Sequence, residues 1–161
     1  MSRMVGQEDF RKVMGHFATG VTVVASRKPD GEPVGLTVNA FTSVSLDPPL
    51  ILICLHQDAD AHDFLLQAGH FGVSILTEDQ QELALSFSRA DSGDRFRDLA
   101  VFDGPLGSPL IRGALAWLDC RVSRAHTGGD HSIIVAEVVE CEAGEGDPLL
   151  FFKGSLMGPN P

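Results

Sequence analysis

The sequence predicts a mainly β fold, an antiparallel barrel-like domain with a few peripheral helices. Runs rich in β-branched and apolar residues recur along the chain, such as VTVVAS, LILICL and FGVSIL, and such runs are typical of strands. Two longer apolar segments flank a Gly-Gly-Asp sequence, which is typical of a β-hairpin. The 161 residues contain no repeat and no linker, so one domain is expected over residues 1–161.

The first element is expected to be a helix from about Gln7 to Phe17. Its apolar residues recur with the spacing i, i+3, i+4, i+7, which places them on one helical face. These residues are Phe10, Val13, Met14 and Phe17. We expect this stripe to pack on its own barrel or on a partner copy.

Strands follow the helix. The run VTVVAS comes after Gly20, and the sequence KPDG at residues 28–31 favours a turn, since Pro fixes φ and Gly accepts a positive φ. A second strand starts at Val34. The run LILICL, residues 50–55, is apolar throughout, so this strand is expected to be buried on both faces.

Two short helices are expected in the middle of the chain. Asp60 and Gly69 favour the N-cap and C-cap of the first, and the strand FGVSIL follows it. Thr77 and Gln80 have the spacing of a capping box at the start of the second. The inner face of that helix is expected to comprise Leu83, Ala84 and Phe87.

The remainder is expected to be a long loop, a hairpin and a last strand. Residues 89–113 are rich in Gly, Pro and Asp, which favours a loop. The hairpin strands are expected at about 114–124 and 131–141, and the last strand has the sequence LLFFK.

The net charge and the spacing of the cysteines limit the possible functions and cellular locations. The net charge of −10 argues against nucleic acid and against an anionic membrane surface, because both attract Lys and Arg. The three cysteines have no CxxC spacing and lie in apolar or alternating runs, which favours buried thiols in a reducing compartment. The N-terminal sequence does not resemble a signal peptide, and no apolar run is long enough to span a bilayer. We therefore expect a soluble cytoplasmic protein.

The absence of several known motifs argues against the chemistries that those motifs support. The sequence contains no GxGxxG, GxxxxGK[ST], GxSxG or HExxH motif. The six histidines lack the tight spacing of metal ligands, so no metal site is expected. The sequence GGDH, which ends at His131, is typical of a hairpin turn but could also direct this histidine at a ligand.

An unusual stretch lies between two strands, at residues 37–47. Small or polar side chains replace the Val, Ile or Leu that a core would require, namely Thr37, Asn39, Ala40, Thr42, Ser43, Ser45 and Asp47. Small residues let a ligand approach the backbone closely, and the Asn39 amide offers donors and acceptors. A solvated bend between strands is the alternative interpretation.

Five segments in one order resemble the flavin reductase family of the split-barrel, FMN-binding type. They are FRKVMGHFATGVTVVAS, GLTVNAFTSVSLDPPLILICL, GSPLIRGALAWLDCRV, GGDHSIIVAEVVE and PLLFFKGS, and together they extend from Phe10 to about Ser155. The resemblance implies a homodimer of antiparallel split barrels. It also implies NAD(P)H:flavin oxidoreductase activity, in which NADH or NADPH reduces FMN or FAD for a partner monooxygenase.

The resemblance implies a set of site residues. FMN or FAD would lie along Thr37, Val38, Asn39 and Ala40, with Ser43 near it. His131 would lie beside the nicotinamide. The phosphate side of the flavin would meet the loop from Leu55 to His62 and basic residues near it. The positions concerned are Asp58, Ala61, His62, Arg89 and Arg95.

This chain departs from its relatives at three places. Asp58 and Ala61 stand where relatives commonly have Ser or Thr, which leaves the choice between FMN and FAD open. Leu156 stands where a Tyr is frequent, and Arg89 stands in place of a Lys. A non-catalytic flavin-binding module on the same barrel, such as a sensor or carrier, remains the alternative function.

Overall fold

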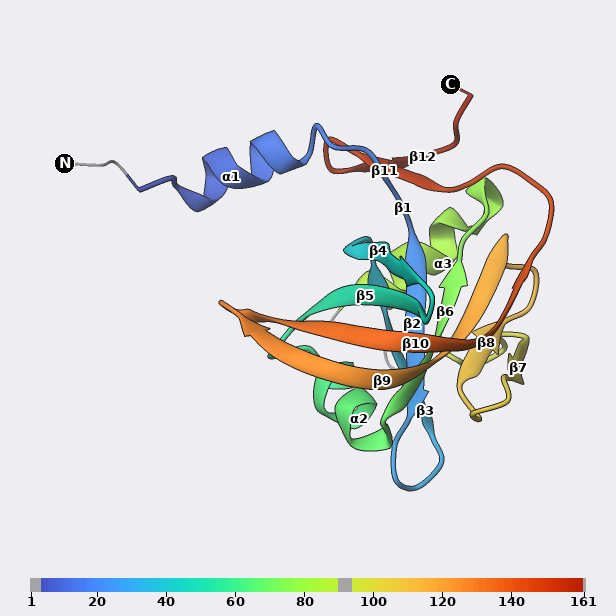
Figure 1. Ribbon diagram of the computed structural model, residues 1–161. Helices are drawn as coiled ribbons and strands as arrows, with labels where there is room; N and C mark the ends of the chain where they lie inside the picture. The colour runs from blue at the N-terminus through green and yellow to red at the C-terminus, as the bar shows by residue number, and fades with distance from the viewer. Residues whose placement is uncertain (1–3, 90–93, 161) are drawn as a thin grey trace.

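The computed structural model describes residues 4–89 and 94–160. Its centre is a seven-stranded antiparallel sheet with the strand order β3-β2-β6-β9-β10-β5-β4 (Figure 1). The expected mainly β, antiparallel architecture is therefore confirmed. The strands span β2 Thr22–Arg27, β3 Pro33–Val38, β4 Phe41–Leu46, β5 Pro49–His56, β6 His70–Ile75, β9 Ala116–Gly128 and β10 His131–Ala143.

Two short helices follow β5 and β6. Helix α2 (Asp60–Ala68) ends at Gly69, which has a φ of 74° as a C-cap requires. The prediction that Asp60 is its N-cap is wrong, because Ala59 holds that position and Asp60 is the first helical residue. The expected capping box is present at the short turn η1 (Glu78–Gln80), where Thr77 N–H donates to Gln80 Oε1 at 3.0 Å. Helix α3 (Gln81–Ser88) follows directly.

The sheet separates two apolar clusters. The larger includes α2 residue Leu65 and the fully buried side chains of Ile53 and Phe71. The smaller lies against α3, where Ala84 and Phe87 are buried as the sequence predicts. The expectation that β5 is buried on both faces is wrong for the single chain. Its burial alternates, with Ile51, Ile53 and Leu55 buried and the residues between them only half-buried.

The C-terminal half contains more strand than the sequence predicts. Residues 94–113, expected as loop, include the hairpin of β7 (Val101–Asp103) and β8 (Pro109–Ile111); residues 90–93 lie outside the described residues. Strands β9 and β10 are joined by the two residues Gly129 and Asp130. The expected last strand, β11 (Leu150–Phe152), pairs with both β1 (Thr19–Gly20) and β12 (Ser155–Met157), and the sequence analysis missed β12.

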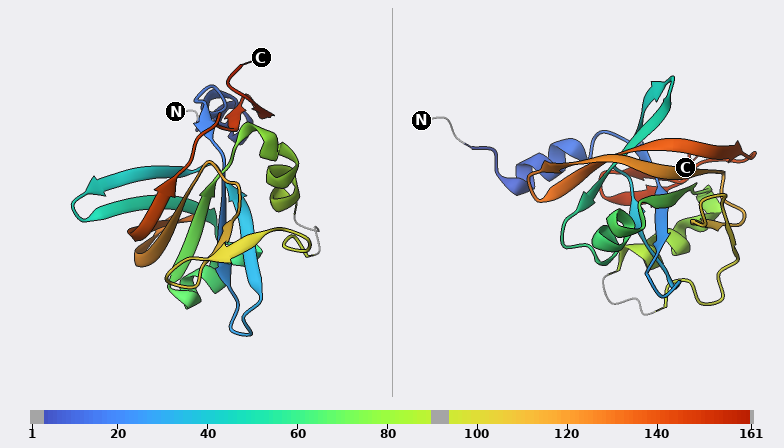
Figure 2. Two further views of the ribbon diagram at one scale, coloured as in Figure 1. Left: turned by 90° about the vertical axis from the view of Figure 1, so that its right-hand side faces the viewer. Right: turned by 60° about the horizontal axis from the view of Figure 1, so that its bottom comes forward.

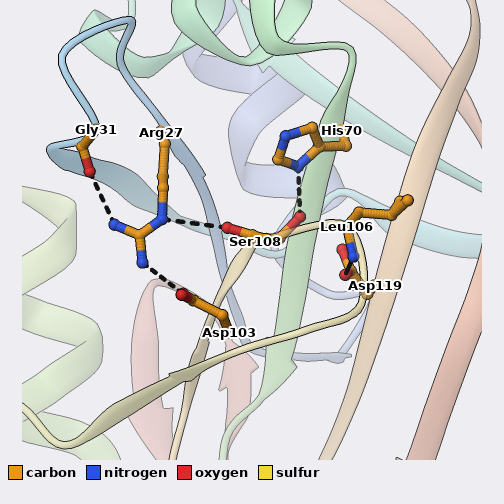
Figure 3. Close-up of polar contacts among 8 residues, drawn as sticks. Arg27, Gly31, His70, Asp103, Leu106, Ser108 and Asp119 are labelled. Carbon is orange, nitrogen blue, oxygen red and sulfur yellow. Dashed lines mark hydrogen bonds and ion pairs between the residues drawn. The ribbon is translucent and has the colours of Figure 1, made fainter.

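Polar contacts fix the loops at the end of the sheet where β2 turns into β3. Arg27 donates from Nη1 to Gly31 O at 2.9 Å and from Nε to Gly107 O at 3.1 Å, and it forms an ion pair with Asp103 (Figure 3). Leu106 N–H donates to the buried Asp119 Oδ2 at 2.7 Å. These contacts hold the β7–β8 segment against the sheet.

Helix α1 (Gln7–Met14) extends away from the rest of the chain, as does the β4–β5 hairpin (Figures 1 and 2). The helix ends three residues earlier than the sequence predicts. Its apolar stripe does not pack on its own sheet, since Val13 is 68% exposed and Phe17 72% exposed. On β4, Leu46 is 95% exposed. The apolar surface of both projections is therefore uncovered in a single copy.

Among the helices that the structure describes, none is both long and apolar enough to cross a membrane.

The three cysteines differ in environment, and we expect their thiols to react in a fixed order. Burial, followed by the negative charge of Asp119, raises the pKa of Cys120 to about 12, so about one such thiol in ten thousand is ionised at pH 8. Burial also raises the pKa of Cys54, whereas Cys141 is exposed. A disulfide reagent at pH 8 should modify Cys141 first, Cys54 slowly and Cys120 only after unfolding. Rapid modification of all three thiols in the folded chain would contradict this order.

Candidate functional site

A groove lies where β3 ends, between α3 and the β11–β12 hairpin. Its volume is about 290 Å³. We call it the Asn39 groove; its lining residues are Val21, Thr37, Asn39, Gln81, Ala84, Leu85, Ser88, Phe151, Gly154 and Leu156. Two of the predicted flavin residues, Thr37 and Asn39, thus lie in one hollow. Leu156, the residue in place of the frequent Tyr, is part of its wall.

Hydrogen bonds between neighbouring elements hold the walls of the Asn39 groove. The Thr37 hydroxyl donates to Ala84 O at 2.6 Å, which fixes β3 against α3. Gln81 Nε2 donates to Leu156 O at 3.3 Å, which fixes β12 against the same helix. The Thr37 hydroxyl therefore has a structural role that the sequence analysis did not predict.

Asn39 and Ala40 form the exposed connection between β3 and β4. The β2–β3 ladder ends at Val38, so the connection leaves the sheet at Asn39. Within residues 4–89 and 94–160, no acceptor is found for the backbone N–H groups of Asn39 and Ala40, or for the Asn39 amide. Two consecutive N–H groups and a side-chain amide are thus free to bind a ligand, which fits the ligand interpretation of this stretch.

The other small polar residues of the stretch have a simpler explanation. Thr42 and Ser43 lie on β4, an edge strand of the sheet, and both are exposed. Small polar side chains suit an exposed edge without a ligand. Val38 is buried in the larger core cluster and contributes packing.

His131 begins β10 directly after the turn and lies opposite His56, the last residue of β5. The two imidazole rings are edge to face, with centroids 5.1 Å apart. Asp130 Oδ1 accepts a hydrogen bond from His131 Nδ1 at 2.7 Å, and Asp130 Oδ2 lies 3.8 Å from His56 Nε2. The hydrogen bond from His131 lowers the pKa of the Asp130 carboxyl. His131 Nε2 is left facing away from this contact.

No sequence signal places His56 in the site. Only the strand register brings this residue next to His131, and no local motif encodes that pairing. The same register places the loop after β5 beside the hairpin, because Gln57 N–H donates to Asp130 O at 3.0 Å.

Three predicted phosphate-side residues follow His56 and differ in accessibility. Asp58 is exposed, and its N–H donates to His56 Nδ1 at 3.1 Å. Ala61 is buried. His62 is also buried, and its two ring nitrogens contact Ser132 Oγ at 2.8 Å and Asp63 Oδ1 at 2.7 Å. The His62 ring therefore holds α2 against β10.

One of the two predicted arginines, Arg95, lines a second hollow, at the start of β3, whereas Arg89 follows α3 and does not line it. Its volume is about 720 Å³, and Arg95, Asp60 and Lys28 are among its lining residues. Arg95 donates to Gly35 O at 2.8 Å and to the backbone oxygen of Arg89. Any side chain at Gly35 would collide with the neighbouring strand, since an added Cβ would lie 2.8 Å from Val24 O. We call this hollow the Arg95 hollow.

The predicted residues thus form three groups, at the Asn39 groove, around His131 and at the Arg95 hollow. Strands β3 and β5 connect these groups. Gly35, Thr37 and Asn39 share one side of β3, and from Gly35 to Asn39 the strand covers about 13 Å. Ala40 O accepts from Cys54 N on one side of β5, and His131 pairs with His56 on the other side. Strand spacing therefore puts Ala40 and His131 about 12 Å apart. His131 does not line the Asn39 groove or the Arg95 hollow in a single copy.

Within the described residues, no group of three His, Cys, Asp or Glu side chains could hold a metal ion.

Comparisons with known proteins give a consistent result. Residues 14–159 match the family described as flavin reductase like domain. The chain is 46% identical over 146 residues to the reductase component of a 4-nitrophenol 4-monooxygenase/4-nitrocatechol 2-monooxygenase from Rhodococcus opacus, covering 91% of this chain and 77% of that protein. It is 44% identical over 147 residues to the FMN reductase (NADH) SmoA of Agrobacterium fabrum, covering 91% and 83%.

Solved structures agree with these matches. The NADH:FAD oxidoreductase SgcE6 of Streptomyces globisporus, in complex with NAD and FAD fragments, superimposes with a TM-score of 0.88 at 39% identity, and the match covers 99% of each chain. Nitrilotriacetate monooxygenase component B from Mycobacterium thermoresistibile gives a TM-score of 0.92 at 37% identity, covering 96% of this chain and 87% of that one.

Proposed function

The chain belongs to the family of flavin reductase like domains, and on that premise we propose that it is an NAD(P)H-dependent flavin reductase. The substrates are reduced nicotinamide and FMN or FAD, and the product is reduced flavin for a partner monooxygenase. The flavin, when bound, supplies the hydride-accepting chemistry. The protein must hold two flat rings in contact and stabilise the negative charge that develops on one of them.

The observation that carries this proposal is the Asn39–Ala40 connection. Two backbone N–H groups without acceptors among the described residues lie beside a groove with an apolar wall. Such preorganised donors suit the stabilisation of a developing anion. No side-chain acid or base is needed for hydride transfer, and none is among the described residues that line the groove.

We place the flavin ring along residues 37–40, with Ser43 near it, and its phosphate toward the start of β3. The Arg95 hollow offers cationic side chains there, at a distance that a ribityl chain can cover. Three acids, Glu32, Asp60 and Asp94, line the same hollow beside Lys28 and Arg95, and Lys28 contacts Glu32 at 3.5 Å. Asp58 is exposed and can turn its carboxylate to water. The acids of the Arg95 hollow offset its cations, so we expect the phosphate to add little to flavin affinity at this end of the site.

Asn39→Leu is expected to weaken FMN binding by about 0.5–1.5 kcal/mol, because the Asn39 amide then no longer forms a hydrogen bond with the flavin. Titration of flavin fluorescence would measure this change, about two- to tenfold in the dissociation constant. Thr42→Val, on the exposed edge strand, serves as a control and should leave the affinity unchanged. Equal affinity of wild type and Asn39→Leu would remove Asn39 from the site.

The test of the function is NADH and NADPH oxidation with and without added flavin. The proposal requires oxidation that depends on flavin and produces reduced flavin. A non-catalytic flavin-binding module would bind FMN or FAD without consuming either nicotinamide. The same assay determines which nicotinamide and which flavin the chain prefers.

We further propose that the active form is a homodimer of split barrels. The sheet has two edges, β3 and β4, and the exposed apolar surface of α1 and β4 supports a second copy as its cover. The continuous sheet from β2 to β10 supports one domain over residues 1–161. The three free cysteines fit a reducing cytoplasm.

Val13→Glu is expected to convert this dimer into a monomer. Val13 is 68% exposed in one copy, and a carboxylate buried at its place in an interface would lack a partner. Light scattering at micromolar concentration should give a dimer mass for wild type and a monomer mass for the variant. Ala100→Glu, on the exposed loop before β7, is the control. A monomer mass for wild type would refute the dimer.

A further inference from the structure

A third hollow lies between the end of α1 and the turn of the β11–β12 hairpin. Its volume is about 480 Å³. We call it the basic hollow; its lining residues are Arg11, Lys12, Gly15, His16, Lys153 and Gly154. All the titratable side chains in this lining are basic, although the whole chain has a net charge of −10. The cations must therefore be held together against their mutual repulsion.

These cations have no acidic partners in the described part of the chain. No carboxylate there lies within 4.0 Å of Arg11, Lys12 or Lys153. The helix dipole accounts for Arg11 and Lys12, because cations are favourable in the last turn of a helix. It does not account for Lys153, which comes from the other end of the chain.

The position of Lys153 has a conformational cost. Its φ is 49°, in the left-handed region that favours Gly or Asn, and Gly154 follows with a φ of 78°. Lys153 N–H donates to Gly15 O at 2.8 Å, and Nζ lies 5.1 Å from the centre of the Phe152 ring. A lysine kept in a conformation that disfavours it indicates a function for its charge.

His16 completes the hollow. Its Nδ1 donates to Lys12 O at 2.7 Å, and its ring contacts Phe152 edge to face with centroids 6.4 Å apart. The second ring nitrogen, Nε2, has no hydrogen-bond partner within residues 4–89 and 94–160 and can contact a ligand.

We propose that the basic hollow binds a phosphate or pyrophosphate group of one of the two nucleotides that react beside the Asn39 groove, an assignment that rests on the proposed function. Gly154 lines both hollows, so the two share a wall. A flavin with its phosphate at the Arg95 hollow leaves the basic hollow to the pyrophosphate of the nicotinamide dinucleotide. A flavin in the opposite orientation would place its own phosphate there. In both cases Arg11, Lys12 and Lys153 provide the countercharge.

The first arm of the test uses inorganic pyrophosphate and calorimetric titration of the full chain. Lys153→Asn removes the charge and keeps a residue that tolerates a positive φ, so the turn is retained. This variant, and separately the pair Arg11→Gln with Lys12→Gln, should bind pyrophosphate about tenfold more weakly than wild type. Arg112→Gln, at an exposed arginine that follows β8 and lines neither the basic hollow nor the Asn39 groove, should bind like wild type. Absence of binding to wild type, or equal binding by all variants, would overturn the proposal.

The second arm identifies the source of the phosphate. If it belongs to the nicotinamide dinucleotide, Lys153→Asn raises KM for NADH about tenfold and leaves FMN affinity unchanged. If it belongs to the flavin, the variant binds FMN about as weakly as wild type binds riboflavin. Unchanged affinity for both nucleotides would overturn the nucleotide assignment. Pyrophosphate binding without any flavin-dependent NADH oxidation in wild type would instead overturn the proposed function and leave the anion site standing.

Discussion

His131→Ala is expected to lower kcat/KM for NADH by about tenfold to a hundredfold, with a change in FMN affinity of less than about threefold. His131 is the first residue of β10, at the tip of the β9–β10 hairpin. By strand spacing, its backbone lies about 12 Å from that of Ala40. The proposed flavin ring lies along residues 37–40, so the histidine would meet the second ring rather than the flavin. Its loss would therefore misplace nicotinamide and leave flavin binding largely intact.

The geometry around His131 defines the controls. His126→Ala removes an exposed histidine from β9 in the same hairpin and should leave the kinetics unchanged. Asp130→Asn should reproduce part of the His131→Ala effect, because the Asp130 carboxylate orients the ring through Nδ1. A lower melting temperature for His131→Ala with unchanged kinetics would identify His131 as a turn residue.

The contact between Asp130 and His131 predicts a pH response at the tip of the β9–β10 hairpin. The pKa of Asp130 is lowered in the folded chain, first by the hydrogen bond from His131. A carboxyl with a lowered folded pKa stabilises the fold above its ordinary pKa and loses that contribution as the pH falls through the lowered value. The hairpin tip should therefore remain ordered by this contact at neutral pH and lose it only in acid.

Local sequence signals predicted the local structure well. The turn at residues 28–31, the C-cap at Gly69 and the capping box at Thr77 each depend on one or two residues whose backbone preferences are strong. The family resemblance placed Thr37 and Asn39 in the same site, and both line one groove. The predicted C-terminal end of α1 was wrong, because the apolar stripe of the sequence continues past the last helical residue, Met14.

Features that depend on register could not be predicted. The neighbours of His131 depend on how β5 pairs with β10, and the contact of Arg95 with Gly35 joins residues 60 positions apart. A continuous apolar run also cannot distinguish burial inside one chain from burial between two chains. For this reason LILICL predicts a strand buried on both faces, although Leu52 and Cys54 are only half-buried in a single copy.

Phe71→Ala is expected to lower the free energy of unfolding by about 3–5 kcal/mol. Phe71 is fully buried on β6, between β2 and β9, and belongs to the larger core cluster. Alanine would leave a cavity there, because side chains from both sides of the sheet hold the surrounding strands in place. Urea denaturation should show a lower midpoint with an unchanged slope, which marks a loss of stability without a change in the surface exposed.

Phe10→Ala is the matched control, since the same side chain is deleted from a helix where it is 58% exposed in one copy. In a monomer this change should cost well under 1 kcal/mol. In the proposed dimer, Phe10→Ala should instead lower the urea midpoint at protein concentrations where the wild type is dimeric, and the difference should disappear on dilution, because loss of subunit contacts weakens association rather than the fold. Phe71→Ala should lower the midpoint at every concentration. A loss below about 1 kcal/mol for Phe71→Ala would show that the larger cluster does not stabilise the sheet. The spacing between the Asn39 groove and His131 would then have to be held by other contacts, because it depends on a rigid sheet.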